Sequence, residues 1–284
     1  MDAQIGTTLE EFDSRFDIEL KLLLEGVYLT YQHDFRQYAV ASLRRRIMQA
    51  MVQFDCKTVS QLQSRVLHEP EVFAKMLQYF TVQVSEMFRD PMYFKAIREQ
   101  VVPVLKTYPS VKIWIAGCST GEEVWSLAIL LAEEGLLDNT LIYATDINAD
   151  SLKTAETGIY SVDRIADFST NYLQSGGRHS LSDYYTTGYG GAIFNRDLRK
   201  RMVFADHSLA TDSVFSEVQF VSCRNVLIYF NPELQERAIG LFADSLVNRG
   251  FLGLGSKESL RFTRHADTFT EFARIEKIYQ RVLR

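Results

Sequence analysis

The sequence predicts an α/β protein in which an all-helical N-terminal domain precedes a doubly wound, mostly parallel sheet with a small antiparallel insertion. Up to about residue 108, apolar residues recur at three- and four-residue steps, which is the spacing of helices. After Pro109, short runs rich in Ile, Val, Tyr and Phe alternate with helical segments, as in a parallel sheet. With 284 residues the chain is long enough for two domains.

The first part of the chain contains four expected helices, at LKLLLEGVYL, FRQYAVASLRRRIMQAMVQF, TVSQLQSRVL and EVFAKMLQYF. Pro70 stands where the fourth would begin, and Pro91 follows Asp90 as a first-turn proline follows a helix cap. We therefore expect a helical domain at residues 1–86 and a linker with a connecting helix at residues 87–110.

The α/β domain is expected at residues 111–284, with strands at VKIWIAG, TLIYATD, VQFVSC and GFLGLGS. Helices are expected at 121–134, 149–157 and 232–248, and the final FTEFARIEKIYQRVL alternates as a closing antiparallel strand pair would. Between about 175 and 205 the pattern breaks, and two glycine pairs mark turns between short alternating runs. We expect a small antiparallel β-subdomain there.

Composition narrows the classes of function. The net charge of −5 and the pI of about 5.6 argue against a general nucleic-acid binder. No stretch approaches the roughly 20 apolar residues of a membrane span, and the N-terminus lacks the pattern of a signal peptide. The 3 cysteines are few and odd in number, as in a reducing compartment, and the histidines show no metal-ligand spacing. We expect a cytoplasmic, metal-free protein that neither binds nucleic acid nor inserts into membranes.

The turn GCSTGEE follows the first expected strand, where ligands bind in open α/β sheets. It lacks both the full dinucleotide fingerprint and the lysine of a P-loop. One interpretation is structural, because Ser119 with Glu122 and Thr120 with Glu123 have capping-box spacing. The other is functional, because a carboxylate here would repel a pyrophosphate and favour a ligand with positive charge. S-adenosylmethionine, with an ammonium and a sulfonium, is such a ligand.

A second carboxylate favours the functional interpretation. Asp146 ends the next expected strand, 24 residues after Glu122, and an acid at that place in a nucleotide-binding unit hydrogen-bonds ribose hydroxyls. Its structural alternative is an N-cap for the following helix. The two acids together predict a class I, Rossmann-like, S-adenosylmethionine-dependent methyltransferase.

Several segments resemble one family. SEMFRD (85–90), GCSTGEEVWSLA (117–128), ATDIN (144–148), GIY (158–160) and SCRNVLIYF (222–230) are similar, in this order, to chemotaxis receptor methyltransferases of the CheR family. The resemblance covers nearly the whole chain and implies the two-domain fold described above. It also implies methyl transfer from S-adenosylmethionine to glutamate side chains of methyl-accepting chemotaxis receptors. The products would be γ-glutamyl methyl esters, which tune adaptation, and S-adenosylhomocysteine.

The resemblance implies site residues as well. Those of the cofactor site are Gln83, Ser85, Arg89, Ala116, Glu122, Asp146, Ser208, Leu209, Asn225 and Val226. Arg89 would also reach the reaction centre, and Tyr229 would lie near the methyl acceptor. The chain departs from the family at Gln83 and Ser85, where Asn-x-Thr is frequent, and at Ser208, where Asn is frequent. We expect cofactor binding to survive these departures, with a changed affinity and changed contacts.

The implied reaction explains why the sequence shows no catalytic triad. A glutamate carboxylate, with a reference pKa of about 4.3, is already ionised near neutral pH and needs no general base. The sulfonium brings its own leaving group, so catalysis by direct displacement depends mainly on alignment. Protein-glutamate O-methyltransferase activity is therefore expected from orienting residues such as Arg89 and Tyr229.

The resemblance also implies partners. Arg44, Arg45 and Arg46 would form a basic surface for the acidic helical bundle of a receptor, although a charge cluster is usually only a solvated helix face. A receptor C-terminal tail could add to the β-subdomain, whose glycines are equally suited to hairpins. We expect a monomer. Two alternatives stay open: a methyltransferase with another acceptor, and a non-catalytic module that senses S-adenosylmethionine or docks on receptors.

Overall fold

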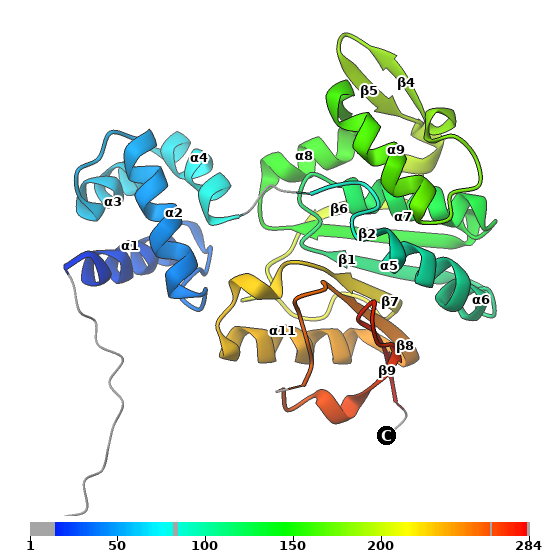
Figure 1. The fold of residues 1–284 in the computed structure, drawn as a ribbon. Coiled ribbons are helices and arrows are strands. Elements are labelled where there is room, and N and C mark those ends of the chain that lie inside the picture. Colours follow the sequence, from blue (N-terminus) through cyan, green and yellow to red (C-terminus); the bar gives the residue numbers. More distant parts are fainter. Residues whose placement is uncertain (1–14, 82–84, 262, 283–284) are drawn as a thin grey trace, which may run out of the picture. The chain divides into compact units, whose positions relative to one another are not determined.

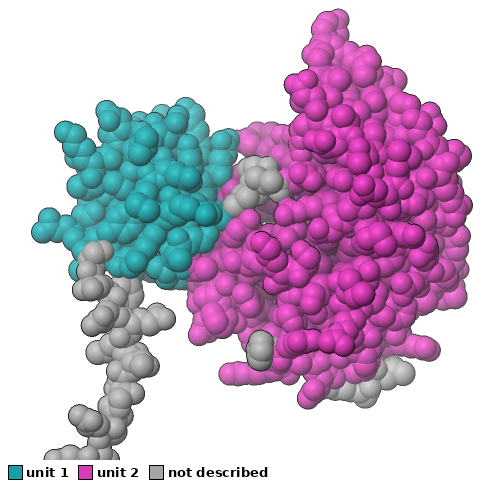
Figure 2. Space-filling view, viewed as in Figure 1, with its two compact units in different colours: residues 1–36, 40–80 teal, residues 37–39, 81–284 magenta. Residues whose placement is uncertain are grey.

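The computed structural model describes residues 15–81, 85–261 and 263–282. It divides the chain into two compact units, Met1–Arg36 with Val40–Phe80, and Gln37–Ala39 with Thr81–Arg284 (Figure 2). The larger unit therefore takes up three residues from the middle of the helical part. The division falls at residue 80, earlier than the expected domain end at residue 86.

The smaller unit consists of helices within its described residues. They are α1 (Arg15–Tyr31), α2 (Val40–Gln53), α3 (Val59–His68) and α4 (Pro70–Phe80), coloured blue to cyan in Figure 1. Each corresponds to one of the four expected helices, although α2 begins at Val40, five residues later than expected, and Pro70 is the first residue of α4 as predicted. Their apolar faces meet at side chains that are fully buried, including Leu23, Ile47, Leu62 and Met76. The three- and four-residue spacing in the sequence therefore marks the core of this unit.

The larger unit is built on a seven-stranded sheet in the order β6-β2-β1-β7-β8-β10-β9. Its strands are β1 (Val111–Ala116), β2 (Thr140–Asp146), β6 (Met202–Asp206), β7 (Val218–Cys223), β8 (Leu246–Leu254), β9 (Phe269–Ala273) and β10 (Ile278–Arg281). The first five strands in the order pair in parallel, and β10 pairs antiparallel with β8 and with β9. The predicted mostly parallel sheet and its closing antiparallel pair are confirmed.

Helices cover both faces of this sheet (Figure 1). They are α5 (Pro91–Ala96), the π-helix η1 (Ile97–Val101), α6 (Val102–Leu105), α7 (Glu122–Glu133), α8 (Ala149–Thr157), α9 (Ile165–Gln174), α10 (Arg196–Arg199) and α11 (Pro232–Ser245). Short 3-10 turns follow Leu136, Ser161, Ser180, Val226 and His265. Helices α7, α8 and α11 and the connecting helix formed by α5, η1 and α6 were predicted, whereas α9 was not.

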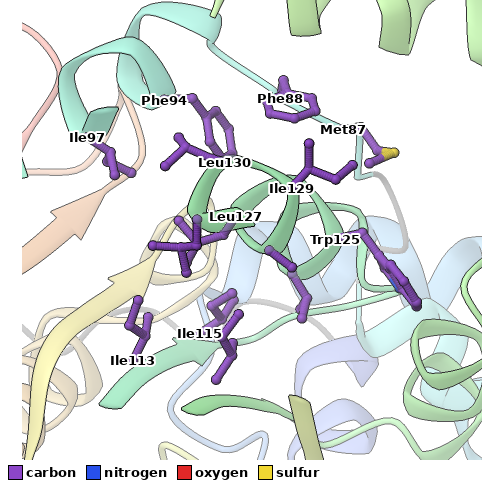
Figure 3. Packing of buried hydrophobic residues seen from close by; sticks show 14 of the residues in the cluster. Met87, Phe88, Phe94, Ile97, Ile113, Ile115, Trp125, Leu127, Ile129 and Leu130 are labelled. Atoms are coloured by element: carbon purple, nitrogen blue, oxygen red, sulfur yellow. The ribbon is translucent and has the colours of Figure 1, made fainter. Parts of the chain in front are cut away.

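Strand β1 shows how the two faces are separated. Ile113 and Ile115 belong to a cluster with the apolar residues of α7, whereas Trp114 and Ala116 belong to a second cluster with α11. Figure 3 shows α7 with Ile113 and Ile115 on one side and Phe88 and Phe94 on the other. Because α7 is covered on both sides, its sequence VWSLAILLA is apolar around the whole helix.

The small antiparallel sheet has different bounds from those expected. It has the order β3-β5-β4, with β3 (Ile159–Ser161), β5 (Gly191–Phe194) and β4 (Tyr185–Gly188). It therefore starts well before residue 175, while β6, which we had expected inside it, is an edge strand of the main sheet. Strand β6 pairs in parallel with β2 from Met202↔Ile142 to Asp206↔Asp146. This pairing places the loop after β6 beside the end of β2.

The described residues contain neither a membrane-spanning helix nor a cluster of metal ligands. None of the helices in the described ranges is long and apolar enough to cross a membrane. Within the same ranges, no group of three His, Cys, Asp or Glu side chains could hold a metal ion.

The C-cap of α8 yields a stability prediction. Gly158 has φ +61°, and a Cβ there would lie 2.2 Å from Trp125 of α7, whereas Gly135 has φ +67° and open space around it. Both Gly→Ala changes impose left-handed strain, but only Gly158→Ala also requires the indole to move. We expect a loss of about 1 kcal/mol for Gly135→Ala and about 3 kcal/mol for Gly158→Ala, measured by urea unfolding. Equal losses would show that the contact with Trp125 is unimportant.

Candidate cofactor site

The candidate site surrounds the turn that joins β1 to α7. Gly117, Ser119 and Gly121 have φ values of 72°, 50° and 90°, so the turn passes repeatedly through the left-handed region. At Gly117 a Cβ would lie 2.5 Å from Val226 in the loop after β7. Glycine is therefore required there, because the two loops approach each other at the carboxyl ends of adjacent parallel strands. Ala116, the last residue of β1, is buried directly before this turn.

Asp146 ties the end of β2 to this turn. Its Oδ2 accepts a hydrogen bond from the Ser119 N–H at 2.8 Å, and its Oδ1 accepts one from the Asn148 N–H at 3.0 Å. The helix cap is Asn148, whose side chain accepts from the N–H groups of Asp150 and Ser151. The N-cap alternative for Asp146 is therefore wrong. Burial raises the pKa of Asp146, and the backbone donors of Asn148 and Ser119 act against that rise.

Glu122 begins α7 with its side chain 0% exposed. Its Oε1 accepts from Arg164 Nη1 at 2.7 Å, and its Oε2 accepts from Thr120 Oγ1 at 2.6 Å. The capping-box alternative is wrong, because Gly121 occupies the N-cap position and the Ser119 N–H is bound to Asp146. A buried carboxylate with lone pairs remaining is suited to an ammonium group.

The second glutamate of the turn, Glu123, lies in a buried polar network that the sequence analysis did not predict. It accepts from Ser222 Oγ at 2.5 Å and pairs with Arg224 at 3.1 Å. Arg224 also pairs with Asp90 at 2.7 Å and donates to the backbone carbonyl of Arg89 at 2.8 Å. The only signal for Arg224 was its place within SCRNVLIYF.

Asp90 takes part in this network. It is the N-cap residue of α5 with Pro91 in the first turn, as predicted, but its φ is 57°, its side chain makes no capping hydrogen bond, and its carboxylate pairs with Arg224. The N–H of Phe88 donates to Ser126 Oγ of α7 at 2.8 Å. The segment that contains half-buried Arg89 is thus attached to the start of α7 and to the end of β7.

Glu258 organises the loop after β7, and the sequence analysis missed it as well. Its side chain is buried, its Oε2 accepts from the N–H groups of Asn225 at 3.0 Å and Gly255 at 2.6 Å, and its Oε1 accepts from the Ile228 N–H. Asn225 has φ 61°, an uncommon conformation for a side-chain-bearing residue. Glu258 lies more than thirty positions from Asn225, so no local pattern could reveal it.

The remaining predicted site residues lie in several separate segments. Ser208 follows β6, and its hydroxyl accepts a hydrogen bond from the Ala210 N–H within its own loop, while Leu209 is buried. The carbonyl of Ser85 accepts from Arg164. Tyr229 is half-buried, and its carbonyl accepts from the Ala39 N–H at 2.8 Å. Gln83 lies outside the described residues.

The expected basic surface on α2 needs a correction. Arg45 is exposed, and Arg44 has a side chain 45% exposed that pairs with Asp17. Arg46, in contrast, is 4% exposed and donates to the carbonyl of Phe80 at 2.5 Å. Consecutive helical residues point about 100° apart, so three adjacent arginines cannot share one face. Arg46 belongs to the interior of the helical unit.

Comparisons with known proteins identify the family to which the chain is similar. The family model "CheR methyltransferase, SAM binding domain" matches residues 83–276, and "CheR methyltransferase, all-alpha domain" matches residues 18–81. A Pseudomonas putida protein named as methyltransferase Cher3 is 59% identical over 265 residues, 93% of this chain and 97% of that protein. A chemotaxis protein methyltransferase of Vibrio parahaemolyticus is 30% identical over 238 residues, 80% of this chain and 82% of that protein. These matches show that S-adenosylmethionine is the cofactor.

The contacts of Glu258 yield a prediction for this site. Glu258→Gln replaces one acceptor oxygen by an amide nitrogen that would face backbone N–H donors. We expect a loss of about 1–3 kcal/mol in unfolding free energy and weaker binding of S-adenosylhomocysteine. Chemical denaturation and calorimetric titration measure the two effects. Exposed Glu233 on α11 serves as the matched control, and equal behaviour of Glu233→Gln and Glu258→Gln would contradict the role given to Glu258.

Proposed function

The chain belongs to the CheR methyltransferase family, and we propose that it methylates glutamate side chains of chemotaxis receptors to give γ-glutamyl methyl esters. The observation that carries this proposal is the pair of buried carboxylates, Glu122 and Asp146, on either side of one turn in a domain of this family. Relatives named as chemotaxis protein methyltransferases support the receptor as methyl acceptor.

The residues of the site fit the cofactor chemically. Glu122 and Asp146 supply negative charge and hydrogen-bond acceptors, which suit an ammonium, a sulfonium and ribose hydroxyls. In this proposal Glu122 binds the ammonium group of S-adenosylmethionine, Asp146 binds its ribose, and Arg89 binds its carboxylate. Residues at the remaining predicted positions complete the site: Gln83, Ser85, Ala116, Ser208, Leu209, Asn225 and Val226. The hydroxyl and the N–H of Ser208 both take part in hydrogen bonds within its own loop, with Ala210 and Asp212.

The chemistry requires little of the protein beyond alignment. S-adenosylmethionine supplies a methyl group that is displaced onto a carboxylate oxygen as the S–CH₃ bond breaks, leaving a neutral thioether and requiring no proton transfer. The acceptor glutamate is ionised near neutral pH, so the protein needs no general base. Arg89 and Tyr229 are proposed to orient the reacting groups, since well-aligned reactants gain on the order of 7–11 kcal/mol.

The receptor would contact both units. Arg44 and Arg45 offer positive charge to an acidic helical bundle, whereas buried Arg46 serves the fold. A receptor tail is proposed to add to the small sheet by strand pairing. The bundle and the enzyme would meet in the cytoplasm, with the enzyme acting as a monomer.

Esterification can be tested directly. Labelled S-adenosylmethionine and receptor-containing membranes from the source cell would be incubated with the wild type, Asp146→Asn, Arg89→Ala and the surface control Asp197→Ala. We expect alkali-released methanol from the wild type and the control, and at least tenfold less, roughly, from the other two variants. Absence of release with intact binding of S-adenosylhomocysteine would contradict receptor methylation. It would favour a cofactor sensor or an enzyme with another acceptor.

Docking on α2 gives a separate prediction. Arg45→Glu places a negative charge on the proposed contact surface without touching the cofactor site. We expect KM for receptor to rise by about fivefold or more at low salt, with less effect at high salt, and unchanged binding of S-adenosylhomocysteine. Lys75→Glu on α4 makes the same charge change as a control. An equal rise for both variants would indicate general charge repulsion instead of a docking contact.

A further inference from the structure

The small antiparallel sheet supplies two side chains to the turn of the candidate cofactor site. Tyr160 of β3 donates from its hydroxyl to the carbonyl of Thr120 at 2.8 Å. Arg164, at the end of the 3-10 turn η3 (Val162–Arg164), donates to Glu122 at 2.7 Å. Both donors come from a part of the chain about forty residues beyond the turn that they hold.

Tyr160 is held rigidly. It is 4% exposed, and its ring packs edge-on against Phe168 of α9 and Phe194 of β5. Burial raises the pKa of its phenol well above the usual value, so the hydroxyl stays protonated and remains a donor. The carbonyl that it binds belongs to the peptide just before Gly121, whose φ of 90° sets the start of α7. The phenol therefore fixes the peptide plane that orients Glu122.

Arg164 joins two segments of the candidate site. One of its nitrogens binds Glu122, another binds the carbonyl of Ser85, and its guanidinium lies 4.7 Å from the centre of the Phe168 ring. A buried carboxylate is costly without a cation or donors. Arg164 and Thr120 provide them, one to each oxygen of Glu122. Lone pairs remain on both oxygens for a ligand.

The small sheet in turn holds these two residues. Tyr160 is the central residue of β3, which pairs with β5 through Tyr160↔Ala192. The N–H of Val162 donates to the carbonyl of Gly190, in the turn between β4 and β5, at 3.2 Å. A displacement of this sheet would therefore be transmitted to the phenol and the guanidinium that position the turn.

We propose that Tyr160 and Arg164 are positioning residues for the amino-acid end of the cofactor, so that the small sheet sets the cofactor affinity. The inference rests on the proposed placement of the cofactor ammonium at Glu122. Neither residue has to touch the cofactor. Arg164 holds the carboxylate that is proposed to bind the ammonium, and Tyr160 holds the peptide just before Gly121. Loss of either lets the Glu122 carboxylate leave the position in which it binds the ammonium.

Calorimetric titration with S-adenosylhomocysteine tests the proposal without any receptor. For Arg164→Gln we expect binding about tenfold weaker, and for Tyr160→Phe about threefold weaker. The matched controls are Tyr185→Phe, whose ring packs on Phe194 in the same small sheet, and Arg199→Gln, whose partner Glu156 is on the surface. We expect both controls to bind within about twofold of the wild type. Arg164→Lys, which keeps the charge, should recover part of the loss.

A second ligand separates positioning from general loosening of the fold. The nucleoside thioether 5′-methylthioadenosine lacks the ammonium and carboxylate, so Arg164→Gln should leave its affinity unchanged. Equal losses for both ligands, unchanged affinity for S-adenosylhomocysteine, or tighter binding through release of Glu122 would each overturn the inference. If Asp146→Asn weakens binding and Arg164→Gln does not, the inference fails while the proposed function stands. If the wild type binds neither ligand, both fail.

Discussion

The geometry of the larger unit depends on the ion pairs that the buried guanidinium of Arg224 makes with Glu123 and Asp90. The guanidinium lies just past the end of β7, pairs with Glu123 of α7 and Asp90 before α5, and sits 4.1 Å from the centre of the Tyr93 ring. Removing one partner of such a buried group typically costs about 3–5 kcal/mol, because the remaining charge is left uncompensated. A strand end, a helix start and the segment of Arg89 are therefore held in one arrangement.

Other buried carboxylates hold the neighbouring loops in a similar way, two of them at the turn after β1 and one at the loop after β7. Glu122, Asp146 and Glu258 each use part of their acceptor capacity on backbone or arginine donors of the protein. The result is a set of loops fixed by negative charge, where a phosphate-binding protein would present backbone N–H groups. In the proposed function this arrangement is organised in advance for a cationic ligand, so that little reorganisation would be needed on binding.

Much of this architecture could be predicted from the sequence, because long apolar runs and helical periodicity are local signals. These local signals predicted the strands β1, β2, β7 and β8 and the helix α7. Strand β3 has only three residues, one of them buried, and so has no pattern to detect. Strand β6 follows a basic run and was assigned to the insertion, since its parallel partner β2 lies far away in sequence.

Residues Gln37–Ala39 belong to the larger unit although they lie in sequence between two segments of the smaller one. The two units therefore cannot be separated by a single cut in the chain. Tyr38 bridges to Phe230, the Ala39 N–H bonds to the carbonyl of Tyr229, and the Asn231 N–H bonds to the carbonyl of Gln37. A fragment beginning after residue 80 would lose these bonds beside the predicted acceptor-facing tyrosine. The larger unit is therefore incomplete without residues from the N-terminal part of the chain. An exchange of N-terminal modules between relatives would also exchange the residues that bond to Tyr229, Phe230 and Asn231.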